Sequence, residues 1–129
     1  MNPSSPINLR DKLDLINEQW TPKVIAELND SIQFKLAKIH GDFVWHVHDD
    51  TDEAFYVLHG QLIIELRNSP NAQPSTVTLN EGDFFVVHKG IEHITRAPSE
   101  CHILIIEPRG VVNTGLVGGD LTAPTDVWL

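Results

Sequence analysis

The chain has 129 residues, which is enough for one domain with its own hydrophobic core. The 18 acidic residues outnumber the 9 Lys and Arg residues, and the formal charge of -9 disfavours nucleic acid as a partner because phosphates would be repelled. Cys101 is the single cysteine, so an internal disulfide is excluded, and no apolar run approaches the length of a membrane span. We therefore expect one cytoplasmic domain over residues 1–129 that binds neither nucleic acid nor membranes.

The N-terminal region predicts a short amphipathic helix over about residues 8–19, with Asn8 as its cap. Leu9, Leu13 and Ile16 recur there at helical spacing, and Pro22 then ends or redirects the chain. From residue 23 to about 107, short runs of Val, Ile, Phe and Leu alternate with turn signals, which predicts a β-sandwich or barrel. Residues 110–129 are rich in Gly, Thr and Pro and predict an extended C-terminal arm.

Several of the predicted strands are apolar on both faces. In AFYVL, for example, Phe55 and Val57 oppose Tyr56 and Leu58. Both faces must therefore be covered. A second copy of the chain, helped by the N-terminal helix or the C-terminal arm, would supply the cover, so we expect a homodimer. The alternative is that the chain covers one face with its second sheet and the other with its own termini.

The run HVHDDTDE is a candidate metal site. Residues i and i+2 share one face of a strand, so His46 and His48 would project side by side. The turn composition of DDT would bring Glu53 back beside them, and a carboxylate adds a hard oxygen ligand. Among the remaining histidines, His93 has the best context for a fourth ligand because it follows a turn at Gly90. The alternative is a solvated hairpin with incidental histidines.

These residues resemble the two conserved motifs of the cupin family. A glycine, HxH, a glutamate and a closing glycine form the first motif, and the second is carried by GDFFVVHKGIEH. The resemblance covers roughly residues 35–107, with two departures: His88 stands where proline is usual and Ala97 where asparagine is frequent. The matching residues are Gly41, His46, His48, Glu53, Gly60, Gly82, Gly90 and His93.

The resemblance implies an all-β fold, the double-stranded β-helix or jelly-roll barrel of the cupins, with its core over about residues 23–107. It also implies a mononuclear divalent metal held by His46, His48, Glu53 and His93. Four such ligands leave two positions of an octahedron open for water, dioxygen or a chelating substrate. Fe or Mn is favoured, Zn or Ni is compatible with the same ligands, and a metal-free barrel is the alternative.

For function, the resemblance implies an enzyme of the dioxygenase, isomerase or decarboxylase type, acting on a small organic molecule chelated to the metal. No catalytic acid or base can be named from the sequence. A module that binds or senses a small ligand or metal without turnover is the alternative. A sugar-phosphate isomerase is a weaker one, because only Arg96 among the scattered basic residues is placed to bind phosphate. Side chains that could wall the cavity, although core packing explains them equally well, are Phe34, Leu36, Tyr56 and Ile106.

Overall fold

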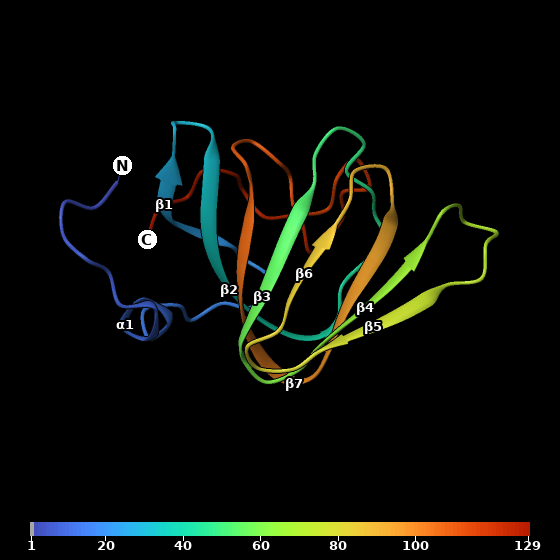
Figure 1. The fold of residues 1–129 in the computed structure, drawn as a ribbon, viewed down its shortest axis with the longest axis horizontal. Coiled ribbons are helices and arrows are strands. Elements are labelled where there is room, and N and C mark those ends of the chain that lie inside the picture. Colours follow the sequence, from blue (N-terminus) through green and yellow to red (C-terminus); the bar gives the residue numbers. More distant parts are fainter. Residues whose placement is uncertain (1) are drawn as a thin grey trace.

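The computed structural model describes residues 2–129, and its regular secondary structure is antiparallel β-strand apart from one short helix (Figure 1). This confirms the all-β prediction. Within the described residues, no helix has the length and apolar character needed to cross a membrane. The elements in chain order are α1 (Leu9–Leu13), β1 (Lys23–Leu28), β2 (Ile32–Asp42), β3 (Glu53–His59), β4 (Leu62–Arg67), β5 (Ser75–Leu79), β6 (Phe84–Val87) and β7 (Glu92–Pro108).

Strand β7 is the long strand that connects the two halves of the fold (Figure 1). Residues 96–108 of β7 pair with β2 on one side, and residues 102–106 pair with β3 on the other, which gives the strand order β1-β2-β7-β3-β6. The first half of β7 pairs with β4, and β4 pairs with β5. One buried cluster takes residues from every strand between β2 and β7, so the sheet closes around a shared core. This is the jelly-roll arrangement that the sequence predicts.

The outer face of β1 and β2 is covered by the ends of the chain itself. Leu13 and Ile16 from the N-terminal segment form a second buried cluster with Ile25 and Leu36, and Leu129 packs against it. The backbone of Val24 also hydrogen-bonds with residues 127 and 129. The chain's own termini thus cover part of an apolar sheet face that a second copy of the chain could otherwise cover. The homodimer itself stays a prediction.

Helix α1 is shorter than the sequence predicts. Asn8 caps it as expected, with the Asp11 backbone N–H donating to Asn8 Oδ1 over 3.0 Å. The helix ends at Leu13. Ile16 is nevertheless buried, so the helical spacing of apolar residues reflects packing against the sheet and not a continued helix. Gln19 instead forms an isolated parallel bridge with Lys38, so the helix does not extend to residue 19.

The C-terminal arm, residues 110–129, folds against the barrel with no helix of its own. Asn113 holds it together: its Nδ2 donates to the Leu121 carbonyl and its Oδ1 accepts from the Ala123 N–H, both over 2.9 Å. Gly115 lies so close to Val47 that a Cβ there would stand 2.5 Å from the Val47 carbonyl oxygen. The arm is therefore fitted to the segment that carries the candidate histidines.

Candidate metal centre

The four predicted ligands meet in one buried cluster. His46, His48, Glu53 and His93 each offer one ligand atom, and these atoms all lie within 4.8 Å of one another. Each of the four residues is less than a tenth exposed. They come from three separate stretches of the sequence, so it is the closed barrel that brings them together.

His46 and His48 reach the cluster without lying on a regular strand, contrary to the prediction. The segment between β2 and β3 is irregular apart from one bridge, in which His46 and His93 exchange backbone hydrogen bonds of 3.0 and 2.8 Å. The bridge sets their ring centroids 4.2 Å apart. His46 and His48 still point the same way, with ring centroids 5.0 Å apart, because an extended backbone alternates its side chains whether or not it pairs. Glu53 is the first residue of β3.

Backbone carbonyl groups orient two of the imidazole rings. His46 Nδ1 lies 2.8 Å from the Val44 carbonyl oxygen, and His93 Nδ1 lies 3.0 Å from that of Ile91. A carbonyl oxygen can only accept a hydrogen bond, so Nδ1 carries the proton in both rings. Each Nε2 then keeps its lone pair. Such second contacts fix the tautomer and ring orientation of histidines that bind metals.

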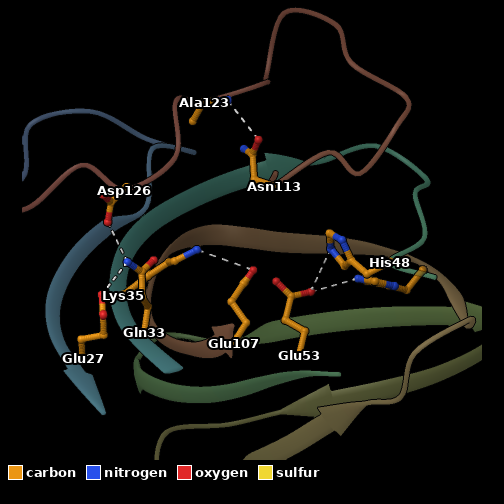
Figure 2. A network of polar contacts seen from close by, with 10 residues as sticks. Glu27, Gln33, Lys35, His48, Glu53, Glu107, Asn113, Ala123 and Asp126 are labelled. Atoms are coloured by element: carbon orange, nitrogen blue, oxygen red, sulfur yellow. Dashed lines mark hydrogen bonds and ion pairs between the residues drawn. The ribbon is translucent and has the colours of Figure 1, made fainter. Parts of the chain in front are cut away.

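The arrangement of donor atoms fits a bound cation. Glu53 Oε1 lies 3.2 Å from His93 Nε2 and 3.6 Å from His48 Nε2 (Figure 2 shows Glu53 beside His48). With the proton on Nδ1, the His93 lone pair faces a carboxylate oxygen, which is unfavourable unless a proton or a cation lies between them. His48 Nε2 is buried and has no hydrogen-bond partner among the described residues. Three imidazole nitrogens and one carboxylate oxygen suit a divalent transition metal.

The electrostatics of the cluster favour the metal-binding forms of these side chains. Burial lowers the pKa of His46 to about 4, and the neighbouring His93 adds to the effect. Burial also lowers the pKa of His48. Burial alone would raise the pKa of Glu53, but the hydrogen bond and charge that His93 supplies when it is protonated, together with the charges of His48 and His46, act against burial, so that pKa is lowered. At neutral pH, His46 and His48 are neutral and Glu53 is ionised, as metal binding requires.

A buried ion pair lies next to the cluster and was not anticipated from the sequence. Lys35 Nζ stands 3.7 Å from Glu107 Oε1, with side chains only 7% and 3% exposed. In Figure 2, Glu107 lies between Lys35 and Glu53. Burial, followed by the charge of Glu53, raises the pKa of Glu107 well above its ordinary value. The sequence pattern that could have indicated a buried Lys35 is strand alternation, which places Lys35 on the same face as Ala37 and Ile39.

Two small cavities adjoin the cluster on the side of Glu53, and a more open groove of about 250 Å³ borders His48. The first has a volume of about 40 Å³, borders His46 and Glu53, and is walled mainly by apolar side chains such as Phe43 and Phe55. The second, of about 20 Å³, also borders Glu53 and contains Lys35 and Glu107. Asn113 of the C-terminal arm lines both. Since one water needs roughly 10–15 Å³, the cavities hold only a few water-sized groups while the arm is in this position.

The predicted cavity wall was wrong. Phe34 and Leu36 pack in the outer cluster beneath the N-terminal segment. Tyr56 and Ile106 alternate with Phe55 and Ile105, which line the first cavity, and so face the opposite side of the sheet.

Arg96, the one candidate for phosphate binding, is occupied elsewhere. Its guanidinium pairs with Asp42 over 2.6 Å and with Glu65 over 2.7 Å. It lines neither of the two cavities beside the cluster. A phosphate group at the cluster would therefore find no contribution from this arginine.

Comparison with known proteins places the chain among similar sequences and structures. The family model described as "Cupin domain" matches residues 33–107. A solved cupin-2 domain containing protein from Shewanella frigidimarina is 50% identical, with a TM-score of 0.73 over 80% of this chain and 94% of that one. Uncharacterized protein YdbB of Bacillus subtilis is 37% identical over 82 residues, 64% of this chain and 67% of YdbB. The 3-hydroxyanthranilate 3,4-dioxygenase of Brucella anthropi is 36% identical over 63 residues, 47% of this chain but only 35% of the dioxygenase.

Proposed function

The chain belongs to the cupin family, and from this premise we propose that it is a metal-dependent enzyme acting on a small organic molecule. Its metal would be one divalent ion, Fe or Mn by preference, held by His46, His48, Glu53 and His93. The observation that carries the proposal is the buried Nε2 of His48, which has no hydrogen-bond partner among the described residues and lies 3.6 Å from Glu53 Oε1. A cation between these groups would satisfy both.

The protein's own residues would prepare the site in three ways. The Val44 and Ile91 carbonyl groups hold the His46 and His93 rings with Nε2 turned inward. Glu53 offsets part of the positive charge that a metal brings. The apolar wall of the first cavity excludes water from the space beside His46. When bound, a metal of this kind acts as a Lewis acid or, if it is iron, activates dioxygen.

Among the reaction classes, we favour a dioxygenase. Among the described residues, the first cavity is lined by no acid or base other than the candidate ligands His46 and Glu53, so proton-transfer chemistry such as isomerisation would have to use Lys35 or Glu107 of the second cavity. An apolar space beside a metal suits dioxygen, which is itself apolar. The similar stretch of a dioxygenase from Brucella anthropi is consistent with this choice.

A second candidate is a binding module that holds a small ligand or a metal without turnover. The small volumes of the two cavities, about 40 and 20 Å³, favour this function because they leave little room for a substrate while the C-terminal arm is in place. In this case metal would bind, but no substrate would be converted.

Oxygen uptake by the iron-loaded protein tests the proposal. A panel of catechols, diketones, thiols and small α-hydroxy and α-keto acids would be offered to the wild type, to His48→Ala and to His88→Ala, whose side chain is 77% exposed and serves as the matched control. We expect at least one substrate class to raise uptake in the wild type and in the control but not in His48→Ala. Bound iron with no uptake across the panel would contradict the dioxygenase and favour the binding module.

A further inference from the structure

Lys35 is a charged side chain in the interior of the barrel. It lies on β2, and its side chain is only 7% exposed. Lysine is rarely buried unless its charge is paired. Its partner Glu107 stands at 3.7 Å, beyond the roughly 2.7–3.2 Å of a direct N–H···O hydrogen bond. The ammonium group therefore has hydrogen-bonding capacity left for another acceptor.

The second cavity is where such an acceptor would bind. Lys35, Glu107 and Glu53 all line it, so one small space reaches from the ammonium group to the candidate metal ligands. Figure 2 shows these three side chains in a row, with Glu107 in the middle. A molecule in this space would contact Lys35 at one end and the cluster at the other.

The buried charges predict the sign of that molecule. A divalent ion contributes two positive charges and Lys35 one, whereas Glu53 and Glu107 contribute one negative charge each when ionised. At least one positive charge then remains without compensation among buried side chains, which is energetically costly, and the raised pKa of Glu107 can only increase this excess. An anionic ligand would neutralise it, and a neutral or cationic ligand would not.

We infer that the ligand of this site is a small carboxylic acid, such as an α-hydroxy or α-keto acid, with a carboxylate oxygen on Lys35 and its other oxygen toward the His–Glu cluster. The inference rests on the proposed function because it takes that cluster as the metal site. The cavity volumes of about 40 and 20 Å³ limit the molecule to a few non-hydrogen atoms while the arm stays in place. Lys35 is thus assigned to recognition of the anion.

Calorimetric titration of the Mn(II)-loaded protein separates this subsite from the metal site. The probes are glycolate, a carboxylate, and acetohydroxamic acid, which chelates a metal through its two hydroxamate oxygens and has no carboxylate to place on Lys35. The variant is Lys35→Met, and its matched control is Lys38→Met on the same strand but the opposite face. We expect Lys35→Met to weaken glycolate binding about tenfold or more, through loss of a charge-assisted hydrogen bond, and to leave acetohydroxamic acid within about twofold. Lys38→Met should bind both probes like the wild type.

A double variant guards against misfolding, because Lys35→Met alone leaves Glu107 buried without its partner. Lys35→Met/Glu107→Gln removes both charges together and should give the same selective loss of glycolate. Equal glycolate affinity in the wild type and the double variant, with metal and acetohydroxamic acid still bound, would overturn the inference and leave the proposed function standing. If the wild type failed to bind Mn(II), or if the loaded protein failed to bind acetohydroxamic acid, both the inferred ligand and the proposed metal-dependent function would be overturned.

Discussion

His93 Nε2 lies 3.2 Å from Glu53 Oε1, although 40 positions separate the two residues in the sequence. Both stand at the beginning of a strand: Glu53 is the first residue of β3 and His93 the second of β7. The backbone bridge between His93 and His46 completes the cluster. The site is therefore a property of the closed barrel, and its stability and chemistry are expected to depend on each other.

Acid should destabilise the metal-free protein through His46. Burial lowers the pKa of this residue from 6.5 to about 4 in the folded protein. Between these values the unfolded chain binds a proton that the folded chain does not, so stability rises with pH and is lost as the pH falls from about 6.5 toward 4. From pH 7 to pH 4 the free energy of unfolding should decrease by about 3 kcal/mol on this account.

Urea denaturation of the metal-free protein at a series of pH values measures this effect. His46→Gln removes the titrating group, and its unfolding free energy should depend less steeply on pH than that of the wild type. Identical pH profiles for the two proteins would show that His46 is not the group responsible.

The C-terminal arm should be destabilised by alanine substitution at Gly115 and should tolerate the same substitution at Gly118. Gly115 has a φ of +60°, and a Cβ added there would stand 2.5 Å from the Val47 carbonyl oxygen. Gly118 has a similar φ of +71°, but a Cβ added there would meet no heavy atom within 4 Å. Gly118→Ala should cost about 1 kcal/mol of backbone strain, and Gly115→Ala about 3 kcal/mol because the arm must also move. Thermal unfolding compares the two variants, and hydrogen exchange over residues 110–126 should accelerate more in Gly115→Ala. Equal losses would mean that the arm does not depend on this contact.

Cys101 should be unreactive in the native protein. Its side chain is buried, and burial raises the pKa of its thiol to about 12, so almost none of the reactive thiolate is present at pH 8. Ellman's reagent should modify it slowly in buffer and rapidly in urea, where the chain is unfolded. Fast stoichiometric labelling without denaturant would contradict the packing described for the core.

The candidate ligands could be predicted because most of them lie close together in the sequence. His46 and His48 are two positions apart, and Glu53 follows a turn composition, so short-range rules were enough to bring three of the four together. His93 needed the spacing of the second motif as well. The jelly-roll fold followed from the strand and turn pattern together with that resemblance, although the irregular backbone around His46 was not foreseen.

Lys35 and Glu107 could not be assigned from the sequence in the same way. A charged residue in a strand ordinarily faces solvent, so alternation with apolar residues was weak evidence for a buried lysine, and only the register of β2 against β7 brings Lys35 and Glu107 close to each other. In that register Lys35 pairs with Ile105, and Glu107 pairs with Gln33 two residues before Lys35. The C-terminal arm, which closes the cavity around them, carries no periodic pattern that predicts where it packs.

The number of metal ions bound per chain decides whether His46, His48, Glu53 and His93 form a metal site. The wild type and the His88→Ala and His48→Ala variants would be purified without chelator or nickel resin, loaded with Fe(II) or Mn(II) under anaerobic conditions, desalted and measured by elemental analysis, with circular dichroism to confirm the fold. We predict one ion per chain in the wild type and in His88→Ala, and little or none in folded His48→Ala. A wild type that retains no ion, or a His48→Ala variant that retains as much as the wild type, would contradict the account.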